Sequence, residues 1–130
     1  MKKMDPVVHF EMPAKDKKRT AEFYEKVFGW KMVQLGAEMS NYLLAGTTPV
    51  DENNMATEPG AINGGFFDYS EEDKMPHVVI SVDDLSESIE KVKSEGGDIE
   101  GEPMDIPGIG KYISFRDSEG NRVGMMQPPS

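Results

Sequence analysis

The sequence predicts an α+β protein built from two tandem βαβββ modules that form a cleft-enclosing mixed sheet. Its 130 residues fit one compact domain. One pattern occurs twice: a short apolar run with a histidine precedes a turn and a helical stretch, first at His9 and again about 68 positions later at His77. Three strand-like segments separated by turn residues follow each helical stretch. We therefore expect a single domain whose modules span about residues 6–67 and 76–127.

The elements of the first module follow from its apolar spacing. An apolar run over residues 7–12 predicts the opening strand. Thr20 and Tyr24 belong to an apolar stripe at helical spacing, which predicts a helix over about 16–28 that ends at Gly29. Strands are expected at three further places: 30–35, 41–45 and 61–67.

The second module repeats this order. An apolar run over residues 77–82 predicts its first strand. Leu85, Ile89 and Val92 then recur at positions i, i+4 and i+7, as on one face of a helix that Asp84 can cap. The last strands are expected at 98–102, 111–115 and 121–127.

Strand alternation predicts which side chains share a face. Phe10 and its apolar neighbours two residues away should lie beneath the first helix, which leaves His9 and Glu11 on the opposite face. His77 and Ser81 take the same position in the second module. For the strand at 61–67, alternation selects either Ile62, Gly64 and Phe66 or their neighbours. The predicted cleft-lining and ligand-binding residues are His9, Glu11, Phe66, His77, Tyr112, Ser114, Gly124 and Met126.

Composition excludes several classes of function. With 14 Lys and Arg against 24 Asp and Glu, the net charge of -10 should repel nucleic acid and anionic membranes. The chain has no cysteine, which excludes disulfides, cysteine metal sites and a thiol nucleophile and fits a reducing compartment. No segment approaches the ~20 apolar residues of a membrane span. We therefore expect a cytoplasmic protein.

Several motifs, in order, resemble one known family. His9 is followed fourteen residues later by Phe23-Tyr24, and the segments 77–84 and 115–122 have the sequences HVVISVDD and FRDSEGNR. Together they resemble the vicinal oxygen chelate superfamily, which includes glyoxalase I, bleomycin-resistance proteins and extradiol dioxygenases. The resemblance covers essentially the whole chain and implies two paired βαβββ modules, often in a homodimer. It also implies, for the metal-dependent members, a divalent ion bound by the first, fourth, fifth and eighth strands.

This sequence departs from the metal pattern that the resemblance implies. By position, His9 matches the first ligand and His77 the third. The second ligand should fall near Gly64-Gly65, and the fourth position is Gly124, so neither offers a ligating side chain. Glu11 could complete a set of two histidines and one carboxylate, as in non-haem iron sites. The segment 102–112 also resembles a loop in a branch of the superfamily that usually lacks the full metal set.

These observations favour a protein that binds a small organic molecule in its cleft without a complete catalytic metal site. Such a protein would be a resistance-type or sequestering protein, or an enzyme whose reaction and catalytic residues the sequence does not identify. The alternative is a divalent-metal-dependent lyase, isomerase or dioxygenase that uses His9 and His77 with a carboxylate such as Glu11. Turnover of methylglyoxal with glutathione is disfavoured because Gly124 replaces the expected glutamate. The expected partners are a small-molecule ligand and a second copy of the chain.

Overall fold

The structure is a computed structural model that describes residues 3–53, 55–106 and 109–129. These residues contain eight β-strands, two α-helices and one short 3-10 helix, η1 (Ala37–Met39). They fall into two compact units. The N-terminal module is the unit His9–Pro76, and the C-terminal module combines residues 3–8 with the chain from His77 onward.

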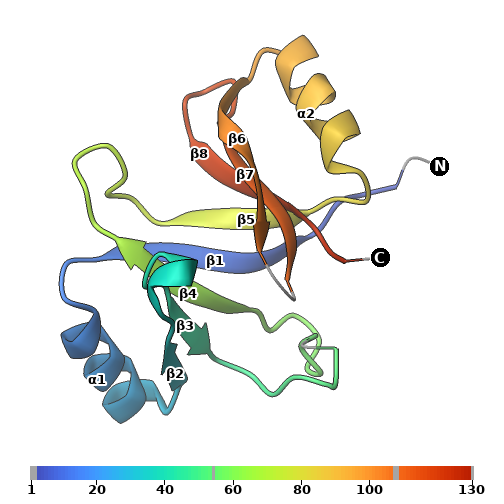
Figure 1. Ribbon diagram of the computed structural model, residues 1–130. Coiled ribbons are helices and arrows are strands. Elements are labelled where there is room, and N and C mark those ends of the chain that lie inside the picture. The colour runs from blue at the N-terminus through green and yellow to red at the C-terminus, as the bar shows by residue number, and fades with distance from the viewer. Residues whose placement is uncertain (1–2, 54, 107–108, 130) are drawn as a thin grey trace. The chain divides into compact units, whose positions relative to one another are not determined.

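The N-terminal module has one helix and a four-stranded mixed sheet (Figure 1). Along the chain its elements are β1 (Val7–Ala14, from His9 onward), α1 (Lys17–Phe28), β2 (Lys31–Gln34), β3 (Leu43–Gly46) and β4 (Asn63–Asp68). The strands lie in the order β2-β3-β4-β1. The pair β1–β4 is parallel, whereas β2–β3 and β3–β4 are antiparallel.

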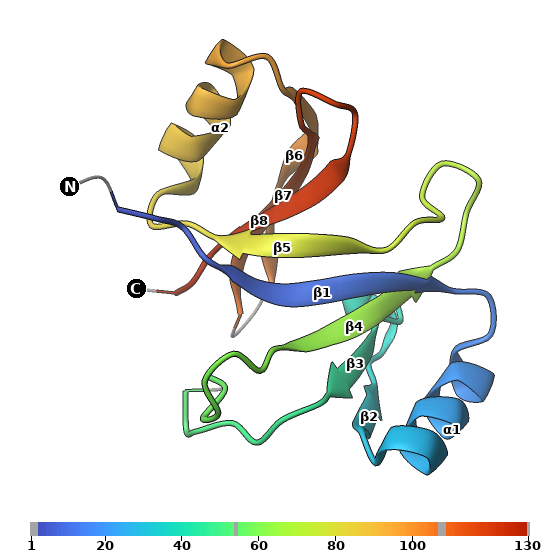
Figure 2. The ribbon, with the colours of Figure 1, turned by 180° about the vertical axis from the view of Figure 1, so that it is seen from behind.

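The C-terminal module has the same topology (Figure 2). Its elements are β5 (His77–Ser81), α2 (Leu85–Ser94), β6 (Asp98–Ile106), β7 (Gly110–Arg116) and β8 (Arg122–Gln127). The strand order is β5-β8-β7-β6, with β5–β8 parallel and the other two pairs antiparallel. The predicted fold class, α+β with two βαβββ modules, is confirmed.

Side-chain caps begin both helices. The Asp16 carboxylate accepts a hydrogen bond from the Arg19 backbone N–H at 3.0 Å, and Asp84 accepts one from Glu87 at 3.0 Å. Each cap satisfies a backbone donor that the helix itself leaves unpaired, which contributes about 1 kcal/mol. Gly29 ends α1 in the left-handed conformation, with φ of 71°.

Each module has its own hydrophobic core between its helix and one face of its strands. The buried residues of the N-terminal core are Ala14, Leu43, Ala45 and Phe66, and those of the C-terminal core are Val82, Leu85, Ile113, Phe115 and Met125. Alternation therefore places the residues between these on the other face of the strands. We call that face, which includes His9 and Glu11 in one module and Tyr112 and Ser114 in the other, the helix-free face.

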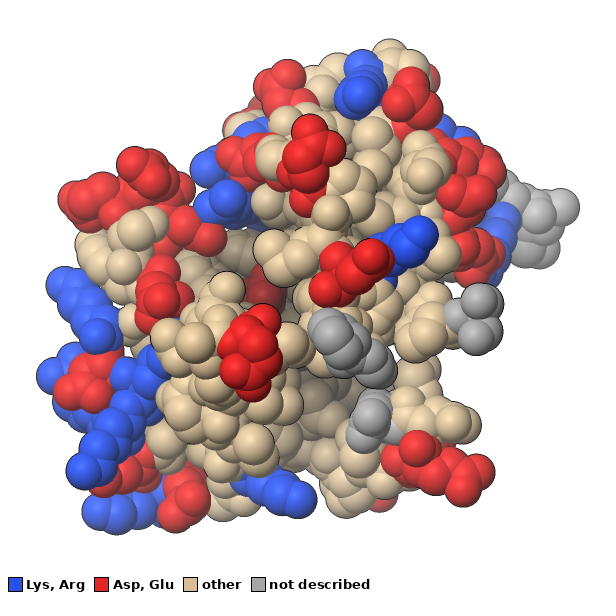
Figure 3. Space-filling model, viewed as in Figure 1, with Lys and Arg blue, Asp and Glu red and all other residues tan. Residues whose placement is uncertain are grey.

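Acidic side chains are spread in separate groups over the surface in view in Figure 3. Lysine and arginine gather chiefly over α1, at the lower left of that view. Of the described helices, none is long and apolar enough to cross a membrane.

Candidate functional site

A chain of polar side chains lies on the helix-free face of the N-terminal module. The Tyr42 hydroxyl donates a hydrogen bond to Glu11 Oε2 at 2.9 Å, and His9 Nε2 lies 3.2 Å from the same Tyr42 oxygen. Because the hydroxyl hydrogen is directed at Glu11, His9 must donate from Nε2. The hydrogen-bond network therefore assigns the Nε2–H tautomer to His9. His9 donates to the Tyr42 hydroxyl, and this hydroxyl in turn donates to Glu11.

The environment of His9 favours the neutral imidazole. Burial lowers the pKa of His9 below its ordinary value of 6.5, and the nearby Glu11 carboxylate opposes this effect without cancelling it. At neutral pH the ring is therefore uncharged, in agreement with the assigned tautomer. Its Nδ1 is then the acceptor nitrogen of the ring.

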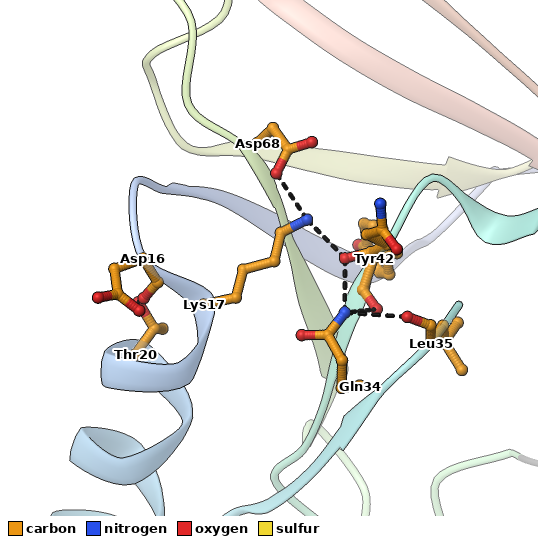
Figure 4. A network of polar contacts seen from close by, with 8 residues as sticks. Asp16, Lys17, Thr20, Gln34, Leu35, Tyr42 and Asp68 are labelled. Atoms are coloured by element: carbon orange, nitrogen blue, oxygen red, sulfur yellow. Dashed lines mark hydrogen bonds and ion pairs between the residues drawn. The ribbon is translucent and has the colours of Figure 1, made fainter. Parts of the chain in front are cut away.

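A second network fixes the segment that carries Tyr42 (Figure 4). Gln34 Nε2 donates to the backbone oxygens of Asn41 at 2.7 Å and Leu35 at 3.0 Å. From α1, Lys17 Nζ donates to the same Asn41 oxygen at 2.5 Å and lies 2.7 Å from Asp68 Oδ1. The Lys17 side chain is only 11% exposed, so these contacts tie the start of β3 to α1.

The Tyr42 ring lies directly over Gly65. Leu44 pairs with Gly65 across β3 and β4, and Tyr42 precedes Leu44 by two residues. A Cβ atom at Gly65 would overlap the Tyr42 ring, so the close approach requires glycine. Gly64 faces the other way, where its own Cβ would meet the Phe10 ring in the core at 2.5 Å.

The C-terminal module repeats this arrangement. Ser114 pairs with Gly124 across β7 and β8, and Tyr112 precedes Ser114 by two residues. A Cβ at Gly124 would meet the Tyr112 hydroxyl oxygen at 2.6 Å. The parallel partner of Gly124 is Val79, whereas that of Gly65 is Glu11. The two modules therefore share the tyrosine-over-glycine contact, and the glycine has Glu11 as its parallel partner in one and Val79 in the other.

The structure places the residues predicted to line a site in two groups, one in each module. His9 and Glu11 meet through Tyr42, and alternation places Tyr112, Ser114, Gly124 and Met126 on one face of the C-terminal module. His77 lies on the helix-free face of β5, because Ile80 and Val82 pack in the core. His9 and His77 belong to different units.

Phe66 does not lie with these residues. It is 2% exposed in the core beneath α1, where its ring centroid is 5.3 Å from that of Tyr24. Of the two alternations open for this strand, the structure adopts the one that directs Gly65 to the helix-free face. The prediction of Phe66 as a cleft residue is thereby corrected.

Tyr42 is the site residue that sequence reasoning missed. It precedes a short strand in a segment with few apolar residues, and nothing in its local sequence indicates a role. The signal was the internal repeat, since Tyr42 takes in the first module the position that Tyr112 takes in the second.

The side chains present do not fit the four-ligand metal site that the resemblance implies. Gly65 and Gly124 stand where two of the four ligands are expected, and the rings of Tyr42 and Tyr112 fill the space that a side chain there would enter. Within residues 3–53, 55–106 and 109–129, no group of three or more His, Cys, Asp or Glu could hold a metal ion. The donors of this chain therefore fall short of that set.

Comparison with known proteins identifies the family. Residues 7–125 match the Glyoxalase/Bleomycin resistance protein/Dioxygenase superfamily. The chain belongs to this superfamily, as the resemblance indicated.

Individual relatives cover nearly the whole chain. A probable lactoylglutathione lyase from Vibrio cholerae is 27% identical over 123 residues, 93% of this chain and 89% of that protein. A glyoxylase-like domain-containing protein from Didymella fabae is 34% identical over 127 residues, 92% of this chain and 91% of that protein.

Solved structures share the fold at low sequence identity. Methylmalonyl-CoA epimerase from Mycobacterium tuberculosis is 14% identical, with a TM-score of 0.67 over 95% of this chain and 88% of that one. A hypothetical protein from Bacillus halodurans C-125, also 14% identical, gives a TM-score of 0.68 over 98% of this chain and 97% of that one.

Proposed function

We propose that this protein binds a small organic molecule on its helix-free faces and does so without a complete catalytic metal site. The supporting observation is the pair of tyrosine-over-glycine contacts, Tyr42 on Gly65 and Tyr112 on Gly124. At two positions where a metal-dependent relative would need a metal-binding side chain, this chain has a glycine covered by a tyrosine ring and its hydroxyl. Those groups suit an organic ligand better than an ion.

The side chains around these contacts indicate what such a ligand would need. The tyrosine rings and Met126 supply apolar surface, while the hydroxyls, Glu11 and the acceptor nitrogen of His9 supply a few polar contacts. Small-molecule sites in proteins typically combine these two kinds of surface. The bound molecule would therefore have an apolar body with a few hydrogen-bonding groups, and the protein would sequester it or transform it in a reaction that is not yet identified.

A thermal-shift screen of small organic molecules tests this proposal. Ligands that raise the melting temperature of the wild type should raise it less in Tyr42→Phe or Tyr112→Phe, because each variant loses a hydroxyl and keeps the ring. Tyr69→Phe is the matched control, since the Tyr69 hydroxyl donates to Glu71 Oε2 at 3.0 Å and Tyr69 lies outside the strands of both modules. A ligand-induced rise in melting temperature that is equal in all three variants would contradict the proposal. A screen in which no molecule raises the melting temperature of the wild type would contradict it as well.

The alternative is a metal-dependent lyase, isomerase or dioxygenase that uses His9 and His77 with Glu11. The observation in its favour is that several relatives are named lactoylglutathione lyase, such as the one from Vibrio cholerae. The test is formation of lactoylglutathione from methylglyoxal and glutathione after loading with Zn²⁺, Ni²⁺, Mn²⁺ or anaerobic Fe²⁺. Metal-dependent turnover that His9→Ala or His77→Ala abolishes would favour this alternative over our proposal.

We also propose that the protein is a cytoplasmic homodimer. In support of a dimer, α1 exposes Phe23, Val27 and Phe28 to 54%, 55% and 60%, which is apolar surface that a second copy could bury. Sedimentation should give twice the chain mass of 14.5 kDa, and Phe28→Ser should shift the equilibrium toward the monomer. A monomeric wild type would contradict this part of the proposal.

A further inference from the structure

Two methionines flank Tyr112 on the helix-free face of the C-terminal module. Tyr112 on β7 pairs with Met126 on β8 at one side and with Met104 on β6 at the other. Direct partners on neighbouring antiparallel strands direct their side chains to the same face, with Cβ atoms about 4.5–5.5 Å apart. The three residues therefore form a row across three strands, with the tyrosine in the middle. We call it the methionine–tyrosine row.

The outer methionine of this row is open to solvent. Met104 is 57% exposed, because β6 is the edge strand in the order β5-β8-β7-β6. Met125, which precedes Met126 on β8, is only 3% exposed and lies in the core. Oxidants reach an exposed thioether far more readily than a buried one. Met104 is therefore the end of the row that an oxidant meets first.

The Tyr112 ring is placed between the two neighbouring strands. On the β8 side, a Cβ at Gly124 would meet the Tyr112 hydroxyl oxygen at 2.6 Å and its Cε2 at 2.7 Å, so the ring lies close over that strand. On the β6 side, Met104 is the cross-strand partner. Thioether sulfur packs favourably against aromatic rings. A change in the polarity of Met104 therefore alters one side of the environment of Tyr112.

We infer that Met104 is an oxidation site through which a peroxide controls the placement of Tyr112. Oxidation turns a flexible apolar thioether into a polar sulfoxide. The sulfoxide oxygen favours water over an aromatic ring, so the Met104 side chain should leave the row and expose more of Tyr112. Because Tyr112 belongs to the proposed ligand surface, oxidation should also weaken ligand binding, and this consequence rests on the proposed function.

The reaction needs only a peroxide, such as hydrogen peroxide. The Met104 sulfur attacks one peroxide oxygen, a sulfur–oxygen bond forms and the oxygen–oxygen bond breaks. Sulfur loses two electrons, and the leaving hydroxide takes the proton of the transferred oxygen and becomes water. The chain has no cysteine, so no thiol within it competes for the oxidant.

Peroxide treatment of the intact protein, followed by NMR of ¹³C-labelled tyrosine rings, tests this inference without any ligand. Peptide mass spectrometry measures the oxidised fraction of each methionine. Met104 should be oxidised at least about tenfold faster than Met125, as their exposure predicts. The Tyr112 ring resonances should shift in proportion to the Met104 sulfoxide, and methionine sulfoxide reductase should reverse the shift. The Tyr24 ring, stacked on Trp30 with centroids 4.6 Å apart, should report an unchanged N-terminal core.

Three variants connect the response to Met104. Met104→Leu keeps an apolar side chain of similar size and cannot be oxidised, so the Tyr112 resonances should no longer respond to peroxide. Met75→Leu is the matched control, because Met75 is 69% exposed but lies outside the strands, between β4 and β5. It should leave the Tyr112 response unchanged. Met104→Gln places a permanent polar group in the row, so without peroxide it should shift the Tyr112 resonances in the direction of the oxidised wild type.

Three results would overturn the inference. The first is oxidation of Met104 that is no faster than that of Met125. The second is an unchanged Tyr112 spectrum in wild-type protein whose Met104 is fully converted to the sulfoxide. The third is a peroxide response of Tyr112 that is as large in Met104→Leu as in the wild type. The first two need no variant, so they hold even if a substitution prevents folding.

The inference and the proposed function fail separately, because the NMR measurement contains no ligand. A Tyr112 response that depends on Met104, in a protein for which the thermal-shift screen finds no ligand, would leave the oxidation site standing and contradict the proposed function. Ligands from that screen, together with a Tyr112 spectrum insensitive to Met104 oxidation, would overturn the inference alone. Where both hold, those ligands should raise the melting temperature less in oxidised wild type than in peroxide-treated Met104→Leu.

Discussion

At the scale of single residues, a tyrosine ring over a glycine is the feature that sets this chain apart from a complete metal site. The glycine lets the ring approach the strand, and the ring in turn excludes any larger residue from that position. In the N-terminal module the Tyr42 hydroxyl also links His9 to Glu11. Gly65 and Tyr42 should therefore behave as one energetic unit.

A double-mutant cycle measures this coupling. Gly65→Ala should lower the free energy of unfolding by about 1–3 kcal/mol, because the new methyl group displaces the Tyr42 ring from its hydrogen bonds. In a Tyr42→Ala background the same change should cost much less, since the ring is gone. Urea unfolding of the four proteins gives the coupling energy. Strictly additive effects would show that the ring does not occupy the space over Gly65.

The lowered pKa of His9 predicts a pH dependence of stability. Its value is 6.5 when unshifted, and burial lowers it in the folded state. At a pH between the pKa of His9 in the folded chain and its pKa in the unfolded chain, the unfolded chain binds more protons. The free energy of unfolding therefore falls as the pH drops below about 6.5. The difference in unfolding free energy between wild type and His9→Gln should be larger at about pH 7 than at about pH 5. An unchanged difference would contradict the neutral, buried state of His9.

Strand alternation explains which site residues the sequence could predict. It places His9 with Glu11, and Tyr112 with Gly124, because those strands alternate cleanly between core and surface. It fails for Phe66, because two successive glycines remove the alternation in β4. Tyr42 lies outside regular strand, and its position depends on a network of contacts from distant elements that no local pattern encodes.

At the scale of elements, Lys17 connects α1 to the segment before β3. It donates to the Asn41 backbone oxygen while nearly buried, and Asn41 and Ser40 both have left-handed backbone conformations, with φ of 55° and 54°. Such conformations are unfavourable for most residues and persist when surrounding contacts fix them. Lys17 is therefore one of the residues that keep Tyr42 over Gly65.

Lys17→Met tests this connection, because methionine keeps the apolar stem and loses the charged donor. The free energy of unfolding should fall by about 1–3 kcal/mol, mostly through the lost bond to Asn41. The ion pair with Asp68 adds little, since Asp68 is 76% exposed. Lys18→Met, at an exposed neighbouring position, is the control for urea unfolding. Equal effects of the two substitutions would contradict the role of Lys17.

The sequence predicted all ten main elements, and the differences lie at their ends. The first strand continues through Pro13 and Ala14, where a turn was expected, because both residues pair with β4. Strand β6 extends beyond residue 102 to Ile106 across a register shift between Glu100 and Met104. Pairing with a partner strand decides these ends, and a single-sequence pattern does not contain the partner. Of the segment 102–112, residues 107 and 108 lie outside the described chain.

At the scale of the whole molecule, the repeat determines both what is shared and what differs between the modules. Both have the same strand order, a capped helix and a tyrosine over a glycine. They differ beside the glycine, whose parallel partner is Glu11 in the N-terminal module and Val79 in the C-terminal module.

The absence of a complete catalytic metal site is the central claim, and metal analysis tests it most directly. Protein purified without a histidine tag is analysed for metals and then titrated by calorimetry with Zn²⁺, Ni²⁺, Mn²⁺ and anaerobic Fe²⁺. We predict no stoichiometric metal and no tight binding isotherm, because Gly65 and Gly124 supply no ligands. Near-stoichiometric metal that disappears in the His9→Ala, His77→Ala double variant would contradict this claim.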